Sequence, residues 1–156
     1  AVTSSTDIVI RKAVAADVET IAEFQRRLAD ESEGLALDVE LVRKGVRAVI
    51  EDPAKGHYWV AEVGGRTVAC LMILLEWSDW KNAAVWWIHS LYVLAEFRRR
   101  GILRAMYGHL RSLVEADTSL RGLRLYVEKD NRTAMAAYEN LGMDGGHYKL
   151  YEWMCR

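Results

Sequence analysis

Apolar residues recur at helical spacing early in the chain, directly after a short apolar run at residues 8–11. Val18, Ile21, Ala22 and Leu28 fall on one side of a helical period, and Phe24 widens that apolar side. This pattern predicts a short first strand followed by an amphipathic helix.

The same periodicity predicts three more helices. One begins after Asp38, whose carboxylate can cap a helix N-terminus, and ends at Asp52-Pro53, because the residue before a proline disfavours helical geometry. The other two are predicted over residues 102–116 and 132–141.

Between the helices, short β-prone runs predict strands, and Gly64-Gly65 predicts a tight hairpin turn between two of them. We expect residues 76–84 to form a loop. The predicted strands are residues 8–11, 58–63, 66–75, 85–93, 123–127 and 147–154. Hairpin pairing is antiparallel, whereas the later strand–helix–strand order implies parallel pairing, so the expected class is mixed α/β or α+β.

Composition narrows the class of protein. The chain has 156 residues, 51% hydrophobic and 28% charged, which is typical of one globular domain over residues 1–156. No apolar run reaches the roughly 18 residues of a membrane span, and residues 1–7 lack a signal-peptide pattern. We therefore expect no membrane association.

The charge and cysteine content exclude further classes. A net charge of −1 provides no basic field for nucleic acid. Cys70 and Cys155 are too far apart in sequence to suggest a metal motif or a disulfide framework, and the histidines are scattered, so we expect a reducing cytoplasm and no metal.

An arginine-rich turn follows the predicted strand 85–93 and leads at once into the helix at 102–116. Gly101 allows close approach of the backbone to a ligand, and free N–H groups at a helix N-terminus attract anions. Arginine side chains can grip phosphate oxygens with two donors. The stretch predicts a pyrophosphate cradle; the alternative is a solvated arginine cluster that opens a surface helix.

A second motif lies on the helix at 132–141. Asn131 is a suitable N-cap, and Gly142 stands where a left-handed residue would end the helix. Tyr138 shares a helix face with Asn131 and could donate a proton in a cleft. The alternative is a core aromatic whose hydroxyl is already hydrogen-bonded.

Together the two motifs resemble the GCN5-related N-acetyltransferase (GNAT) superfamily. The family's cofactor motif, Arg/Gln-x-x-Gly-x-Gly/Ala, is matched by Arg98-x-x-Gly101-x-Leu103, with Leu103 departing from the usual Gly or Ala. The family's Asn-x-x-Ala-x-x-x-Tyr-x-x-x-Gly-Phe motif is matched from Asn131 to Met143, including Tyr138. The tryptophan spacing is similar to an uncharacterised bacterial branch.

The resemblance implies a mixed, mostly antiparallel sheet of six to seven strands, four helices on its faces and splayed central strands. It implies acetyl-CoA as cofactor, with the pantetheine arm in the gap between the splayed strands and the pyrophosphate on the arginine-rich turn. The implied cofactor contacts are Leu91, Tyr92, Val93, Arg98, Arg99, Arg100, Gly101, Ile102, Leu103, Arg104, Asn131 and Tyr138.

The resemblance also implies direct attack of a substrate amine on the thioester. Tyr138 is then the candidate that protonates the leaving thiolate, and the Leu91 N–H the candidate that stabilises the oxyanion. His89 is the candidate base, because period two places it on the same face as Leu91. Its alternative role is a half-buried structural histidine. Glu76 is the rival base, and a water chain is a third option.

Two segments could hold the acceptor amine. Residues 30–40 carry five acids, of which Glu33 beside Gly34 is our choice, and Trp77 with Asp79 could bind an ammonium group. The alternatives are a solvated loop, core packing and a dimer contact. The expected acceptor is a polyamine, an aminoglycoside or another small amino compound.

The alternative function is a non-catalytic acyl-CoA-binding or regulatory module of the same fold. A homodimer is expected from the surface tryptophans and from the family's habit.

Overall fold

The computed structural model describes residues 7–156 and groups them in two compact units, one ending at Arg124 and the other running from Leu125 to Arg156. The start of the chain, in which we expected no signal pattern, lies outside the described residues through position 6.

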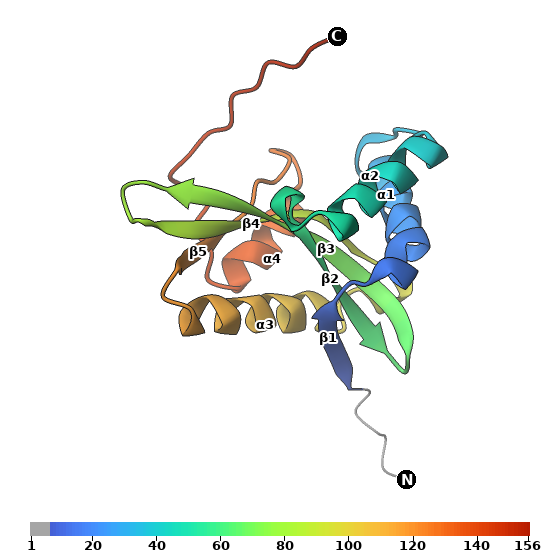
Figure 1. Cartoon of the computed structure of the whole chain (residues 1–156), viewed down its shortest axis with the longest axis horizontal. Helices are drawn as coiled ribbons and strands as arrows, with labels where there is room; N and C mark the ends of the chain where they lie inside the picture. The colour runs from blue at the N-terminus through green and yellow to red at the C-terminus, as the bar shows by residue number, and fades with distance from the viewer. Residues whose placement is uncertain (1–6) are drawn as a thin grey trace. The chain divides into compact units, whose positions relative to one another are not determined.

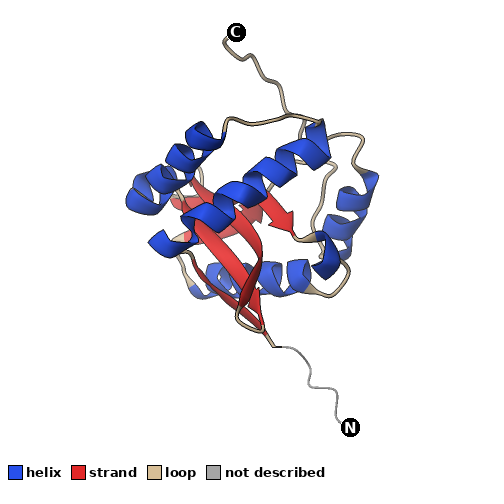
Figure 2. Ribbon diagram, turned by 90° about the vertical axis from the view of Figure 1, so that its right-hand side faces the viewer, coloured by secondary structure: helices blue, strands red, loops and turns tan. Residues whose placement is uncertain are grey.

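The first unit is a curved sheet with helices on both of its faces (Figures 1 and 2). Neighbouring strands follow chain order, with antiparallel pairing from β1 to β4 and parallel pairing between β4 and β5, which confirms the mixed class. The strands are β1 (Ile8–Lys12), β2 (His57–Val63), β3 (Arg66–Ser78), β4 (Ala83–Val93) and β5 (Leu120–Arg124). The helices are α1 (Val18–Glu33), α2 (Val39–Glu51) and α3 (Ile102–Ala116).

Different helices cover the two faces of the sheet. Gln25 of α1 contacts Cys70 on one face, whereas the ring of His109 on α3 packs edge-on against Trp59 on the other, with ring centroids 5.2 Å apart. Large side chains fill both interfaces and are almost completely buried, so this unit has a continuous apolar core on each side. They include Ile21, Val60, Leu71, Ile73, Met106 and Leu110.

Local sequence signals account for the element ends. Asp38 caps α2 by accepting a hydrogen bond from the Leu41 N–H at 2.8 Å, and α2 ends at Glu51, before Pro53. Gly64 and Gly65 have φ of 58° and 78°, the left-handed pair that a two-residue hairpin requires. These predictions are confirmed.

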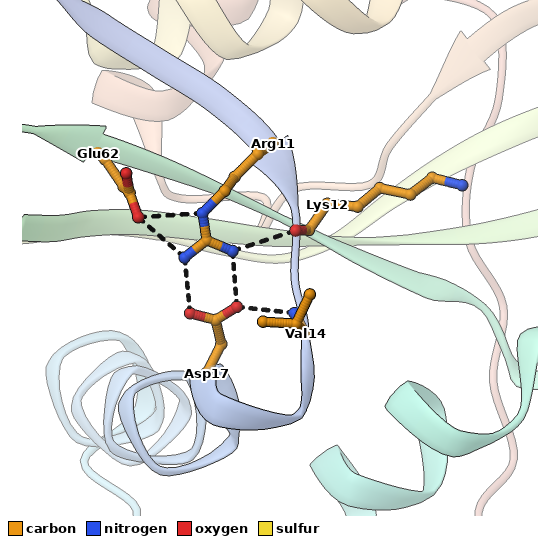
Figure 3. Close-up of polar contacts among 5 residues, drawn as sticks. All are labelled: Arg11, Lys12, Val14, Asp17 and Glu62. Atoms are coloured by element: carbon orange, nitrogen blue, oxygen red, sulfur yellow. Dashed lines mark hydrogen bonds and ion pairs between the residues drawn. The ribbon is translucent and has the colours of Figure 1, made fainter. Parts of the chain in front are cut away.

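An ion-pair cluster fixes the start of α1 to the sheet (Figure 3). Arg11 on β1 forms two hydrogen bonds with Asp17, of 2.8 and 2.9 Å, and a third with Glu62 on β2 at 3.0 Å. The side chain of Asp17 also accepts from the Val14 N–H, and the hydrogen bond from Arg11 lowers the pKa of this buried carboxyl. The N-terminal end of α1 is thereby fixed against β1 and β2.

The β3–β4 hairpin is longer than predicted. The ladder continues through the pairs Glu76↔Val85 and Ser78↔Ala83, so the loop expected at residues 76–84 is wrong and only residues 79–82 form the turn. The polar residues there suggested a loop. Backbone pairing nevertheless extends the ladder, because a strand needs paired N–H and C=O groups but tolerates polar side chains on an exposed face.

The predicted strand count is too high. Residues 7–156 contain five strands rather than six or seven, and β5 lies at 120–124 instead of 123–127. Residues 147–154 form no strand, and their side chains are exposed, Tyr151 at 88% and Trp153 at 85%. Alternating residues show which face a strand would bury, but they do not show whether a partner edge is available.

In the second unit, the helix α4 (Arg132–Asn140) has the predicted caps. The side chain of Asn131 accepts a hydrogen bond from the Ala134 N–H at 3.1 Å. Gly142 has a φ of 90°, and the Met143 N–H bonds back to the Tyr138 carbonyl at 3.1 Å. The end of α4 therefore has the left-handed glycine geometry that the sequence indicated.

Candidate functional site

A bulge interrupts β4 at Ser90 and Leu91. His89 pairs with Met72 and Tyr92 pairs with Cys70, so two residues of β4 lie opposite the single residue Leu71. Ser90 has a φ of 53°, in the left-handed region that side chains other than glycine rarely adopt. One strand is thus locally kinked within an otherwise regular hairpin.

The bulge corrects one prediction about the faces of β4. Cys70 and Met72 share a face of β3, so their partners Tyr92 and His89 share the same face of β4. Leu91, next to Tyr92, therefore lies on the other face. The expectation that period two places His89 and Leu91 on the same face is wrong, because the extra residue reverses the alternation.

Beyond the bulge, β4 has an open edge within the first unit. β5 pairs with β4 only from Ala84 to Trp87. The Ala84 N–H donates toward β5, to Ser119, whereas the Leu94 N–H donates toward β3, to Val68. Backbone N–H and C=O groups of successive residues point alternately to the two sides of a strand. With the extra residue of the bulge included, this alternation places the backbone groups of Leu91 and Val93 toward the open edge.

This orientation is the one that pairing with an extended, amide-bearing ligand requires. The Val93 carbonyl already accepts a hydrogen bond from Arg98 Nε at 2.9 Å. A carbonyl has two lone pairs, so one remains for a ligand. The assignment of Leu91, Tyr92 and Val93 as cofactor contacts remains a prediction with this geometry in its favour. Tyr92 itself is buried against Phe24 of α1, so it can contribute only through its backbone.

The turn before α3 presents a row of backbone donors. Arg99 and Gly101 have φ of 62° and 82°, and the first bond of the helix runs from the Ala105 N–H to the Gly101 carbonyl. Among the residues that the structure describes, no acceptor bonds the N–H groups from Arg99 to Arg104, and no side chain caps α3. Consecutive free N–H groups in left-handed turns form a concave anion-binding site.

Glycine is required at 101 by conformation rather than by space. A Cβ built there would meet no atom within 4 Å, whereas its φ of 82° is strained for any other residue. Half-buried Leu103 replaces the small residue of the motif, but its contribution to this row is its N–H, which any residue supplies. The residues present therefore fit a pyrophosphate group.

The arginines of the turn divide into two roles. Arg98 is engaged within the protein, because it forms a 2.6 Å ion pair with Glu31 and lies over the Tyr92 ring. Arg100 lies over the Phe97 ring. Arg99 and Arg104 are exposed at the start of α3 and no ion pair of the described residues involves them, so they can contact an anion directly.

Glu31 was missed by sequence reasoning. Its carboxylate accepts hydrogen bonds from Tyr92 at 3.0 Å and from Arg98, which ties the last turn of α1 to the arginine-rich turn. Extending the helical periodicity of α1 through residues 30–33 would have identified it. α1 continues to Glu33, so residues 30–33 lie on a helix rather than in a connecting loop.

His89 is half-buried on the face of β4 shared with Met72. Its ring centroid lies 6.1 Å from that of Trp87. Burial lowers the pKa of His89 below its ordinary value of 6.5, so the imidazole is mostly neutral at pH 7. A neutral imidazole can accept a proton, which is consistent with the predicted base.

Glu76, the rival base, is occupied by other groups. One carboxylate oxygen accepts from the Trp87 indole N–H at 2.9 Å, and the other pairs with Arg124 at 2.6 Å. Taking up a proton would disrupt the ion pair with Arg124. The structure thus favours a structural role for Glu76.

Tyr138 and Asn131 belong to the second unit. Burial raises the pKa of the half-buried Tyr138 hydroxyl, which keeps it protonated near neutral pH. Asn131 uses its side-chain oxygen to cap α4, which leaves its amide NH₂ to contact a ligand. Their roles remain predictions.

The predicted acceptor residues are spread over two places. Glu33 is exposed at the end of α1, before Gly34 with its φ of 63°. Trp77 lies near the tip of the β3–β4 hairpin, and the carboxylate of Asp79 accepts from the Trp80 N–H in the turn. Trp77 pairs with Ala84, so roughly 20 Å of strand separate it from Leu91, at about 3.3 Å per residue. The structure does not bring Trp77 and Asp79 to the bulge.

No helix among residues 7–156 has the length and apolar character that crossing a bilayer would need.

The chain is similar to known acetyltransferases in sequence and in fold. Residues 19–143 match the model of the acetyltransferase (GNAT) family. A solved structure described as a "possible acetyltransferase", from Clostridium difficile 630, is 42% identical with a TM-score of 0.89, and the match covers 96% of this chain and 98% of that one. No curated protein matches the chain.

More distant structures show the fold alone. A ribosomal-protein-alanine N-acetyltransferase from Brucella melitensis biovar Abortus 2308 is 15% identical, with a TM-score of 0.78 and coverage of 96% of this chain and 100% of that one. An aminoglycoside N-acetyltransferase in complex with CoA is 13% identical, with a TM-score of 0.75 and coverage of 99% and 100%.

Proposed function

Since this chain belongs to the acetyltransferase (GNAT) family, which uses acetyl-CoA, we propose that it transfers an acetyl group from acetyl-CoA to a primary amine of a small molecule by direct attack. One observation carries the proposal: the open edge of β4 leads into a turn whose N–H groups, from Arg99 to Arg104, bond to no acceptor within the described residues.

The chain's own residues would bind the two ends of the cofactor differently. Backbone groups of Leu91 and Val93 would pair with the amides of the pantetheine arm along the open edge. The N–H groups from Arg99 to Arg104, with the side chains of Arg99 and Arg104, would hold the pyrophosphate. When bound, acetyl-CoA supplies a thioester carbonyl that an amine can attack.

Three residues would then handle charge and protons. The Leu91 N–H would donate to the carbonyl oxygen as negative charge develops on it. His89, neutral because its pKa is lowered by burial, would accept the proton of the ammonium group. Tyr138, whose raised pKa keeps its hydroxyl protonated, would donate a proton to the departing sulfur.

The proposed acceptor is a polyamine, an aminoglycoside or another small amino compound. Similar folds include enzymes named for aminoglycosides and for a ribosomal protein, because one fold can serve several acceptors through different site residues.

Two accompanying expectations belong to the same proposal. Cys155 is an exposed free thiol and Cys70 a buried one, which suits a reducing cytoplasm. Trp77 and Trp80 are 60% and 95% exposed and could form a homodimer contact, which sedimentation of the purified protein would detect.

The test is thiol release from acetyl-CoA over a panel of amines, combined with calorimetric titration of CoA. We expect CoA binding, thiol release with at least one amine class, and a Tyr138→Phe variant that loses turnover while CoA affinity stays close to wild type. Tight CoA binding without turnover on any amine would favour a non-catalytic acyl-CoA-binding module. Absence of CoA binding would reject the proposal.

A further inference from the structure

The open segment of β4 is held from one side by α1. Gln25, half-buried on α1, donates its side-chain amide to the Ser90 carbonyl at 3.3 Å, and the same nitrogen lies 3.4 Å from Cys70 Sγ. The Ser90 carbonyl is the one turned by the left-handed φ of the bulge. Gln25 therefore contacts the backbone where β4 departs from regular geometry.

A second contact from the same helix holds the other end of the segment. The Glu31 carboxylate pairs with Arg98, whose Nε donates to the Val93 carbonyl. Glu31 also accepts the hydroxyl hydrogen bond of Tyr92. α1 thus fixes Ser90 directly and Val93 through one arginine, with Leu91 between the two points.

The bulge needs such support. A serine with a φ of 53° is strained, and a strand without the extra residue would direct the Leu91 backbone toward β3 instead of the open edge. Cys70, the other polar neighbour of the Ser90 carbonyl, is buried, and its thiol is a weak donor. The Gln25 amide is then the main donor available to the Ser90 carbonyl.

We propose that Gln25 and Glu31 are positioning residues: through Ser90 and through Arg98 they hold Leu91 and Val93 so that the backbone groups of both face the open edge of β4. The role rests on the proposed function, because that edge is where acetyl-CoA would pair. Gln25 sets the direction of the Leu91 N–H and therefore acts on turnover, whereas Glu31 fixes the start of the arginine-rich turn and therefore acts on CoA affinity.

The test uses the full chain with two variants and two matched controls on α1. Gln25→Met removes the amide donor while keeping the side-chain length, and Glu31→Ala frees Arg98. Arg26→Met and Asp30→Ala change exposed neighbours on the same helix. Amide hydrogen exchange of residues 88–94, measured without any ligand, is the first readout, and buried residues of α3 serve as the internal reference.

We expect exchange in residues 88–94 to be at least about tenfold faster in both variants, with α3 unchanged, because losing a local hold lowers only the local opening free energy. With acetyl-CoA, Gln25→Met should lower kcat about tenfold at nearly unchanged CoA affinity, and Glu31→Ala should weaken CoA binding about threefold. Adding Ser90→Gly to Gln25→Met should restore most of the turnover, because glycine adopts the left-handed φ without help.

Exchange of residues 88–94 at the wild-type rate in either variant would overturn the proposal that α1 fixes β4 at both Ser90 and Val93. Faster exchange throughout α3 as well would overturn the positioning role, since it would indicate a general loss of stability. If the wild-type protein neither binds CoA nor releases thiol, the proposed function fails, while the exchange measurement still decides whether α1 holds the bulge.

Discussion

The two ends of β4 differ in what they leave unpaired. At the end that leads to α3, backbone groups of Leu91 and the N–H groups from Arg99 to Arg104 lack partners within the described residues. At the hairpin end, β4 pairs continuously with β3 up to the turn. There it is side chains that are exposed to solvent, and 95% of the Trp80 surface is accessible. Free backbone donors in a fixed geometry can bind an anion, whereas aromatic side chains exposed on a regularly paired strand need not mark a binding site.

The largest effect is expected from His89, beside the bulge. His89→Ala should lower kcat about a hundredfold, as removal of a general base commonly does, with CoA affinity little changed. Because burial lowers its pKa, the wild-type kcat/KM should rise with pH through a midpoint below 6.5 and stay flat above it. The variant should lose this acidic limb. A pH–rate profile with the same limb in both proteins would assign the base elsewhere.

The next largest effect tests the turn itself. Gly101→Val cannot adopt the φ of 82° without strain, so the row of N–H groups should be displaced and the Kd for CoA should rise at least about tenfold. Gly108→Ala is the matched control on α3, since a Cβ there meets no atom within 4 Å. Calorimetric titration of CoA into both variants measures the two dissociation constants. Equal affinities would show that the turn is not the anion site.

A smaller effect is expected from the charge of the same turn. Arg99→Ala should weaken CoA binding about threefold at low salt, and the difference from wild type should shrink as salt is added, because exposed charges are screened. Arg121→Ala, on β5, is an exposed-arginine control outside the turn. Titrations at two ionic strengths measure this. A salt-independent loss would indicate that Arg99 acts through packing instead.

The features that could be predicted from the sequence are those that depend on neighbouring residues. Helix ends could be predicted because Asp38, Asn131 and Gly142 act through their own neighbouring backbone. The arginine–glycine turn could be found for the same reason, since Gly101 reports a local backbone requirement. These are local causes, and local sequence contains them.

The bulge could not be predicted, because serine gives no signal for a left-handed residue. The support at Ser90 comes from Gln25, which is distant in sequence, and so do the contacts of Glu31 with the arginine-rich turn. Likewise, the sequence allows Glu76 as a base, whereas in the structure Arg124 and Trp87 each contact one of its carboxylate oxygens. Long-range partners decide which polar side chains are free, and one sequence does not reveal them.

The smallest effect is expected at the tip of the β3–β4 hairpin, and measuring it tests whether that end of β4 takes part in binding. Trp80→Ser and Asp79→Asn should each change CoA affinity and turnover by no more than about twofold, as surface substitutions usually do, because this tip lies at the opposite end of β4 from the turn. Thiol release and calorimetry measure both quantities. If the acceptor KM instead rises strongly while CoA affinity is unchanged, the tryptophans bind the amine, and the exposed side chains of the hairpin are part of the site after all.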